Sequence, residues 1–432
     1  MIRTLGGLVA VATIATVTAG DGAAQTPPAP QPWLREAMSP QMRSDLDQTP
    51  AFLRDTKLGL NLRTYFRDNE ASEDVFQRAW AGGGSLTYHS GWLADLFAIG
   101  GAFYTSQPIW APEEHDGTKL LAPGQSPINV IGEAFAKLRY EEHLFTGWRQ
   151  KIDVGYVNPQ DNRMVPNTFE AAMLTGKVGW ASYAAGFLWG MKIREGTKFV
   201  PLSQVAGANG SDEPGYLWGV ELTPWEPLSI ELNGIYVNDV LGTTFANGEY
   251  VHKFSDTLLG AFGLQFTDQR SLGSNLIGDF ETWNAGARVR GLWHGVGLEL
   301  ALSQTGDDAS ISSPFGSFPG YLSLINKDFD AAGQTAWGVK LTNDFANLGL
   351  RGLTGFFWYA DGNGVINPAT GADANDFREY DFSLTYAPPR DVFGGKLYGF
   401  SIRGAVALVD IEGTSGLLPD YRIIVNYAIP LL

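Results

Sequence analysis

The clearest absence in this sequence of 432 residues is cysteine, of which there is none. A secreted chain of this size in an animal usually carries disulfides, because an oxidising compartment lets them form and persist. Their absence favours a fold that closes itself by hydrogen bonds, in a compartment where cysteine is avoided.

Two further absences narrow the class of protein. Beyond the N-terminal segment the sequence has no run of about 18 apolar residues, so no membrane-spanning helix is predicted. Basic residues are outnumbered, with 30 Lys and Arg against 46 Asp and Glu, and the net charge of −16 argues against nucleic acid as a partner. Aromatic residues make up 12% of the chain, which excludes general disorder.

The N-terminus has the pattern of a secretory signal peptide over residues 1–24. Arg3 precedes an apolar stretch that runs from Leu5 to Ala19, and small residues precede a cleavage site after Ala24. A buried N-terminal helix is the alternative. Residues 25–56 are rich in proline and polar side chains, so we expect a periplasmic tail with one short helix near Trp33.

From residue 57 to residue 432 the chain repeats segments of about ten residues that alternate apolar with polar side chains, bounded by Gly, Pro, Asn or Asp. Short connections, such as 90–95, 181–182 and 226–227, alternate with longer ones, such as 67–77, 106–129 and 305–335. Short turns on one side and long loops on the other are typical of outer-membrane barrels. The pattern predicts an all-β, transmembrane antiparallel barrel of about 18 strands, with the long loops outside the cell.

The apolar face of each strand should meet lipid and the polar face a wet lumen, because a barrel of this size is too wide for side chains to fill. In the segment 147–157 this places Ile152 and Val154 on the lipid side. Aromatic residues near strand ends should mark the two membrane interfaces: Trp148, Tyr156, Trp180, Trp225, Trp283, Trp293, Trp358, Tyr386 and Tyr427. A soluble β-sandwich or propeller would show the same alternation and is the alternative.

Basic residues are the predicted solute path. The strand alternation points Lys137, Arg139, Arg149 and Lys151 into the lumen from adjacent strands, and Arg288 and Arg290 from a later one. A continuous row of cations would guide carboxylates through a wet pore. For each residue the alternative is an ion pair that braces the wall.

Two loops have unusual composition. Residues 158–169 carry prolines at both ends with Arg163 between them, and residues 312–338 are rich in Phe and Tyr. Since aromatic loops seldom remain in water, either loop could fold into the lumen and narrow it, or pack on another extracellular loop.

Three stretches carry a family resemblance. "NRMVPNTF" followed by "MLTGK" resembles the third-loop region of OprD-type outer-membrane porins, "KDFDAAGQTAW" resembles their entry into a late strand, and "YRIIVNYAIPLL" is similar to their closing strand. The resemblance implies an 18-stranded monomeric barrel narrowed by infolded loops. Association of barrels into an oligomer is the alternative. It also implies a lumenal basic row for small carboxylates, which Lys137, Arg149 and Lys151 fit, with Arg163 in the matching loop.

The same resemblance implies an acidic group opposite the row in some members, for which Asp307 and Asp308 lie in the corresponding loop. The chain departs from barrel proteins in its last residue, because Leu432 stands where an aromatic residue is common. Together these features predict a passive porin in the outer membrane of a Gram-negative bacterium, in contact with its lipid. It would carry amino acids or aromatic and other organic acids.

No enzyme chemistry is expected. The sequence has neither a GxSxG elbow nor a Walker loop. No two of its five histidines stand at metal-ligand spacing, so neither a metal nor a cofactor is predicted. A barrel-borne hydrolase acting on lipid is the alternative function.

Overall fold

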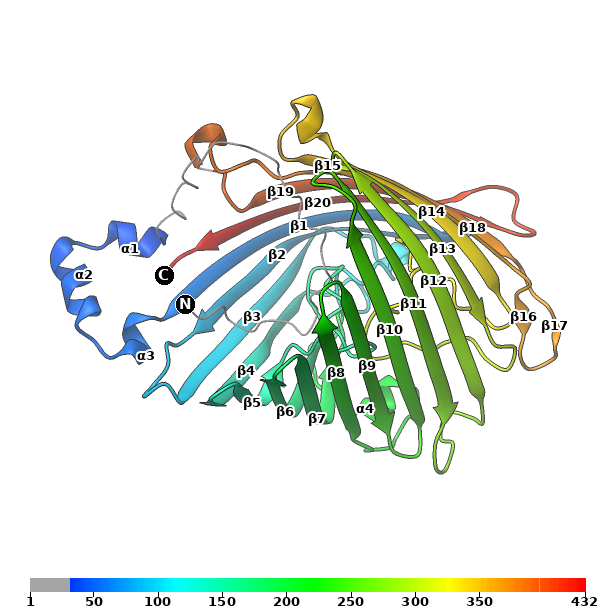
Figure 1. Cartoon of the computed structure of the whole chain (residues 1–432), viewed down its shortest axis with the longest axis horizontal. Helices are drawn as coiled ribbons and strands as arrows, with labels where there is room; N and C mark the ends of the chain where they lie inside the picture. The colour runs from blue at the N-terminus through cyan, green and yellow to red at the C-terminus, as the bar shows by residue number, and fades with distance from the viewer. Residues whose placement is uncertain (1–31, 396) are drawn as a thin grey trace.

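The computed structural model describes residues 32–395 and 397–432. Within these residues 18 strands form one closed sheet, and a two-stranded hairpin stands apart from it (Figure 1). The barrel strands are β1 (Lys57–Ser72), β2 (Val75–His89), β3 (Phe97–Trp110), β4 (Ile128–Tyr140), β5 (His143–Gln150), β6 (Thr168–Val178), β7 (Ala181–Lys192), β8 (Gly215–Trp225), β9 (Leu228–Val237), β10 (Leu241–Lys253), β11 (Leu258–Ser271), β12 (Glu281–Trp293), β13 (Val296–Thr305), β14 (Thr335–Asp344), β15 (Leu353–Asn363), β18 (Phe377–Tyr386), β19 (Phe400–Ile411) and β20 (Leu418–Pro430).

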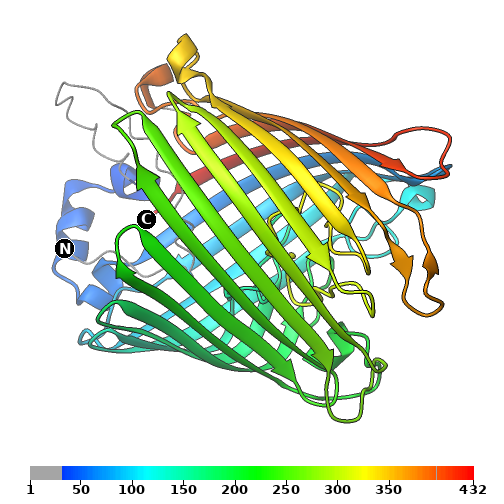
Figure 2. The ribbon, with the colours of Figure 1, turned by 45° about the vertical axis from the view of Figure 1, so that its right-hand side comes forward.

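The sheet closes where the last strand meets the first. β1 pairs with β20 in antiparallel register, from Gly59 opposite Pro430 to Asn69 opposite Asp420. The other strands each pair with their neighbours in the chain, and they run tilted around the barrel (Figure 2). The predicted barrel of about 18 strands and its closure by the C-terminal strand are confirmed.

The barrel strands have an apolar outer face, and their inner face is polar except on β6 to β10, where apolar residues pack against the infolded loops. On β18, Phe382 and Leu384 are about half exposed on the outside, whereas Glu379 and Asp381 are buried on the inside. Closure is what makes such an outer face compatible with lipid, because every backbone group in a closed sheet has a partner. No helix in the described part of the chain is long and apolar enough to cross a membrane.

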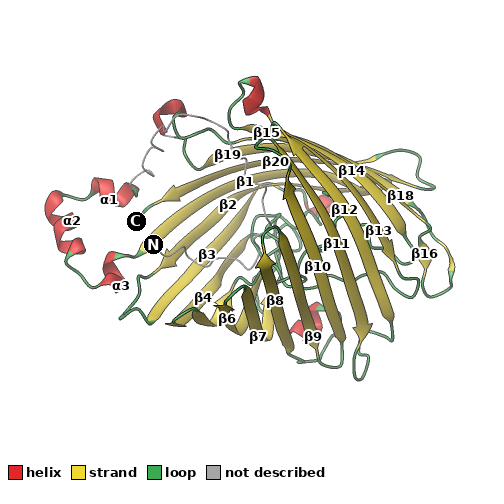
Figure 3. Cartoon of the chain, in the orientation of Figure 1, coloured by secondary structure: helices red, strands yellow, loops and turns green. Residues whose placement is uncertain are grey.

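Helices are short and lie in the connections and the N-terminal segment (Figure 3). They are α1 (Trp33–Ala37), α2 (Pro40–Asp47), α3 (Ala51–Arg54), η1 (Glu113–His115), α4 (Leu202–Val205), η2 (Phe345–Leu348) and η3 (Val392–Gly395). The N-terminal segment joins the barrel seam, because Leu34 N–H donates to the Leu431 carbonyl at 2.8 Å. The expected helix near Trp33 is present and two more follow it, while the predicted signal peptide, 1–24, lies outside the described residues.

The connections differ in length between the two ends of the barrel. One end, which we call the short-turn end, has links such as 141–142, 179–180, 226–227 and 294–295, and it also holds α1 to α3. The other, the long-loop end, has 111–127, 151–167, 193–214 and 306–334, together with the hairpin β16 (Ile366–Asn367) and β17 (Ala372–Asp373). The expected long loop at 67–77 is wrong, because β1 and β2 continue to a two-residue turn at 73–74.

Two loops fold into the barrel, as Figure 1 shows. We call residues 151–167 the β5–β6 loop and residues 306–334 the β13–β14 loop. They bind each other, since the side chain of Asn158 donates to the carbonyl of Ser317 and accepts from its N–H at 3.0 and 2.8 Å. Phe315 and Phe318 pack with Tyr156 in a buried cluster on the inner wall. The infolding alternative is therefore confirmed for both loops.

The segment 147–157 is not one strand, and its predicted outward face is wrong. β5 ends at Gln150, and Val154 and Val157 form a small turn that packs inside the barrel. Gly155 has φ +52°, and a Cβ there would lie 2.1 Å from Oδ1 of Asn233. Asn233 lies on β9, and Val154 lies against Gly219 of β8, so the alternating apolar residues belong to a turn that covers the inner wall of β8 and β9.

Candidate functional site

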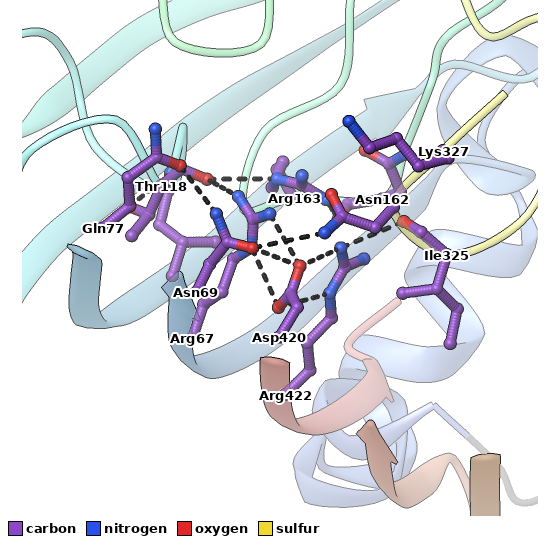
Figure 4. A network of polar contacts seen from close by, with 12 residues as sticks. Arg67, Asn69, Gln77, Thr118, Asn162, Arg163, Ile325, Lys327, Asp420 and Arg422 are labelled. Carbon is purple, nitrogen blue, oxygen red and sulfur yellow. Dashed lines mark hydrogen bonds and ion pairs between the residues drawn. The ribbon is translucent and has the colours of Figure 1, made fainter. Parts of the chain in front are cut away.

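The buried centre of the site is an arginine pair on the two closing strands. Arg67 of β1 and Arg422 of β20 both bond the carboxylate of Asp420, with Nη2–Oδ2 distances of 2.7 and 2.6 Å (Figure 4). Alternation along β1 directs Arg67 inward between Tyr65 and Asn69, while Phe66 points outward. Asp420 is fully buried, so both guanidinium groups are fixed on the inner wall.

A third guanidinium reaches the same place from the β5–β6 loop. Nε of Arg163 donates to the carbonyl of Thr118 at 3.1 Å, and Nη1 of Arg67 donates to the same carbonyl at 3.2 Å (Figure 4). Arg163 bonds only carbonyl groups within the described residues, so it has no anionic partner there. Arg194, just beyond β7, bonds the side chain of Asn162 next to it.

A cavity of about 250 Å³ lies against these side chains. Its cationic lining residues are Arg67, Lys119, Arg163, Arg194 and Lys327, and Glu70 is the one acid among the lining residues. We call this set, with Arg422 and Asp420, the arginine site. It stands where the infolded loops meet the closing strands.

Charge crowding shows in the pKa values of the two loop arginines. Burial lowers the pKa of Arg163 well below its usual value, and the nearby charges of Arg67 and Arg422 lower it further. Burial, together with the same two charges, lowers the pKa of Arg194 to about 10. Guanidinium groups remain protonated at neutral pH, so an anion in the cavity would relieve this repulsion.

The β13–β14 loop is held in the lumen by two buried carboxylates of β18. Glu379 accepts the N–H groups of Asn326 and Lys327 at 2.8 and 2.7 Å, and Asp381 accepts that of Ile325 at 2.9 Å. The carbonyl of Ile325 in turn accepts from Arg422 at 3.0 Å. These bonds set Lys327 at the edge of the cavity.

Of the residues predicted for the path, Lys137 and Lys151 lie inside the barrel. Lys137 stands over the ring of Phe135 at 4.8 Å, and Lys151 lies 3.5 Å from the carboxylate of Glu133. Arg139 is at the short-turn end, where it bonds exposed Asp95 at 3.2 Å. These three residues do not contribute to the arginine site.

Arg149 does not lie on the same face of the sheet as Lys137. It pairs directly with Ala134 and Glu170, three ladder positions from the pair formed by Lys137 and Thr146. Since successive residues of a strand point to opposite faces, Arg149 and Lys137 lie on opposite sides of the sheet. Arg149 bonds Glu170 at 3.0 Å, so the prediction of one stripe through Arg149 is wrong. The cause is the two-residue turn at 141–142, which pairs odd-numbered residues of β4 with even-numbered residues of β5, so that Thr146 and not Arg149 shares the face of Lys137.

Arg288 and Arg290 form a balanced cluster on β12. Both bond Glu249 of β10, and both lie within 4.0 Å of Glu299 of β13. Two cations facing two acids leave no net charge, so these residues match the bracing alternative.

The sequence reasoning missed Arg67 as a site residue, because it assigned that position to a loop. Neither Arg194 nor Arg422 is among the residues predicted for the path. Asp307 and Asp308 are exposed at the start of the β13–β14 loop, and the acids of the arginine site are Glu70 and Asp420. Over the described residues no group of three or more His, Asp or Glu side chains could hold a metal ion.

The comparisons with known proteins agree with this architecture. The family model described as outer membrane porin, OprD family, matches residues 50–431. No curated protein matches the sequence. Among the solved structures that resemble the fold, Pseudomonas aeruginosa OccK9 (OpdG) has 19% sequence identity and a TM-score of 0.79, and the match covers 88% of this chain and 100% of that one. Pseudomonas aeruginosa OpdK with vanillate has 20% identity and a TM-score of 0.77, and the match covers 88% of this chain and 100% of that one. Pseudomonas aeruginosa OccK2 (OpdF) in complex with glucuronate has 18% identity and a TM-score of 0.76, and the match covers 89% of this chain and 100% of that one.

Proposed function

This chain belongs to the OprD family of outer membrane porins, and from that premise we propose that it admits small carboxylate-bearing solutes by passive, selective diffusion. Amino acids and aromatic or other organic acids are the solutes that we expect. The observation that carries the proposal is the arginine site, in which four guanidinium groups gather but only two of them, those of Arg67 and Arg422, bond a carboxylate. The six cationic residues of the arginine site outnumber its two acids, Glu70 and Asp420.

The chemistry of the site suits a carboxylate better than a neutral solute. One cation attracts a carboxylate 4 Å away by about 1–4 kcal/mol, as the effective dielectric falls from that of water to that near a protein surface. The planar fork of arginine matches the two oxygens of a carboxylate. Rapid passage requires that each contact between the solute and the wall be weak. Several cations along the path provide several weak contacts in place of one tight one.

The relatives support the same class of solute. OpdK has been solved with vanillate and OccK2 with glucuronate, and both ligands carry one carboxylate. A lipid hydrolase remains an alternative that no observation on the described residues favours.

Further parts of the path are also proposals. We assign Arg163 to the narrow region and Lys137 and Lys151 to the inner wall beyond it, with Arg139 at the short-turn mouth. Arg288 and Arg290 brace the wall. By the loop asymmetry of outer-membrane barrels the short-turn end is periplasmic, which would make residues 25–56 a periplasmic tail after a cleaved signal peptide, 1–24. A single barrel, 57–432, would be sufficient for transport.

Uptake into liposomes tests the proposal with glucuronate and glucose, which have similar size and differ in charge. Arg163→Gln combined with Arg194→Gln should reduce glucuronate uptake much more than glucose uptake. Arg149→Gln combined with Arg288→Gln also removes two charges, but outside the arginine site, and should leave the ratio unchanged. Equal rates for the two solutes in the wild type would contradict the proposed function.

A further inference from the structure

The outer wall of the barrel has a hollow on β10 to β13, near the short-turn end. Gly260 of β11 lies directly opposite Gly291 of β12 in the ladder, so two neighbouring outer positions have no side chain. Bulky side chains fill the adjoining rows of the same face on both sides: Phe262, Val289, Leu258 and Trp293. The cavity at this place has a volume of about 440 Å³.

The hollow opens away from the lumen. Phe262 and Val289 beside it are about half exposed, whereas Arg290, next to Gly291 in the chain, points inward and bonds Glu249. A Cβ built at Gly291 meets no heavy atom within 4 Å, so no side chain of the described residues covers the floor there. A gap of this kind loses dispersion contacts unless another molecule fills it.

A histidine stands at the side of the hollow. His252 of β10 lies directly opposite Gly260, and its ring centroid is 6.4 Å from that of Tyr250 and 4.5 Å from that of Phe254. One ring nitrogen of a neutral histidine always carries a hydrogen. Among the described residues that N–H has no hydrogen-bond partner.

Trp293 stands between the hollow and the short-turn end. Its side chain is 60% exposed, and its indole N–H also lacks a partner among residues 32–395 and 397–432. The sequence places both Trp293 and Trp358 at the membrane interfaces. For Trp358 this is wrong, because it pairs with Asp381 on the inner face of β18. Trp293 faces outward, where a ring with one polar edge suits the level of lipid headgroups.

We propose that this hollow, which we call the outer groove, binds one glycerophospholipid. One acyl chain lies on the backbone of Gly260 and Gly291, and the headgroup phosphate accepts hydrogen bonds from Trp293 and His252. Because the short-turn end is periplasmic in the arrangement proposed above, the lipid belongs to the periplasmic leaflet of the outer membrane. The outer groove is independent of the solutes that the barrel admits.

A second copy of the barrel is the competing occupant. Small residues on an outer wall allow two membrane proteins to approach closely. A second apolar wall, however, would cover the N–H groups of His252 and Trp293 without offering them acceptors, which costs free energy. A phospholipid supplies both an apolar chain for the floor of the outer groove and phosphate oxygens for these two donors.

Native mass spectrometry of the purified barrel in detergent tests the proposal with dioleoylphosphatidylglycerol and dioleoylglycerol, which have the same acyl chains and differ in the phosphate headgroup. The wild type should retain one phosphatidylglycerol. It should retain about 10-fold less dioleoylglycerol at the same concentration, which is the lower end of what one hydrogen bond to a charged group contributes. Equal retention of the two lipids would overturn the proposal.

Gly291→Leu fills the outer groove and should abolish the retention of phosphatidylglycerol. Gly404→Leu is the matched control, because a Cβ built at Gly404 also meets open space, and Gly404 pairs with Leu384 and Ile423 on the outer face. This control should retain the lipid as the wild type does. Equal retention in the two variants would assign the lipid to another part of the wall and overturn the outer groove.

The headgroup contact has its own test. Trp293→Phe with His252→Phe keeps two rings but removes both N–H groups, so retention of phosphatidylglycerol should fall to that of dioleoylglycerol. Trp225→Phe with His115→Phe is the control and should change nothing. Trp225 is also 60% exposed at the short-turn end, and His115 lies in η1 at the long-loop end.

Two further outcomes are decisive. A lipid-free dimer of the wild type that Gly291→Leu converts to a monomer would assign the outer groove to a second barrel and overturn the phospholipid. Should Gly291→Leu fail to fold, unchanged retention of phosphatidylglycerol in Trp293→Phe with His252→Phe would overturn the proposal.

Discussion

Arg67 of β1 lies directly opposite Arg422 of β20 in the ladder that closes the barrel. Like charges at opposed positions destabilise a sheet, and here the buried carboxylate of Asp420 bonds both guanidinium groups. The seam of the barrel and the arginine site therefore share one counter-ion. Closure brings residues from the two ends of the chain into one site.

Asp420→Asn should destabilise the barrel strongly. The change leaves two buried guanidinium groups without their anion, which costs about 3–5 kcal/mol of unfolding free energy when a buried pair is broken. Asp161→Asn is the control, because Asp161 is half exposed beside Arg63 and such a pair contributes at most about 1 kcal/mol. Urea unfolding in lipid vesicles measures both, and equal losses would contradict a shared buried counter-ion.

Glu249→Gln should reduce stability without changing selectivity. Glu249 is buried and bonds both Arg288 and Arg290, so its loss should cost on the order of 3 kcal/mol while the ratio of glucuronate to glucose uptake stays constant. Asp410→Asn removes a more exposed pair with Arg378 and should cost less than about 1 kcal/mol. A selective loss of glucuronate uptake in Glu249→Gln would show that Arg288 and Arg290 contribute to the solute path and do not only brace the barrel wall.

Glu379→Ala should release the tip of the β13–β14 loop. Glu379 accepts two backbone N–H groups, and each such bond contributes roughly 0.5–1.5 kcal/mol. Without them Lys327 should leave the cavity edge, so single-channel conductance and current noise should both rise. Glu412→Ala, which removes an exposed acid at the end of β19, should leave the current as in the wild type. An unchanged current in Glu379→Ala would show that other contacts hold the loop.

Val289→Arg should cost about 2–4 kcal/mol of stability if it lies near the membrane midplane. Val289 is 55% exposed on the outer face of β12, between two inward-facing arginines. Asn61→Arg places the same side chain on the inner face of β1 and should cost little, because the lumen is wet. Refolding into lipid at increasing urea measures the stability of both variants. A larger loss for Asn61→Arg than for Val289→Arg would show that the outer and inner faces are assigned the wrong way round.

The sequence was sufficient for the parts of the fold that depend on one repeated pattern. Alternation over ten residues predicts strands, and it correctly directs Arg288 and Arg290 inward. Loop lengths predict the two ends of the barrel. Each of these features is local, so a single segment carries the information.

The site was less predictable because it depends on contacts between distant segments. Ile152 and Val154 alternate like strand residues, yet they cover an inner wall built by β8, which no local pattern reveals. The arginine site joins residue 67 to residues 163, 194 and 422. Whether a lumenal arginine is neutralised, like Arg288, or left in excess, like Arg163, is decided by neighbouring strands and loops.

The reversal potential across a planar bilayer with a tenfold gradient of potassium chloride tests the central claim most directly, namely that the arginine site selects anions in an otherwise acidic protein. The wild type and the control Arg288→Gln with Arg290→Gln should both favour chloride. Arg163→Gln with Arg194→Gln, which removes the same number of charges, should lose that preference. A wild type that favours potassium, or equal shifts in the two double variants, would contradict the account.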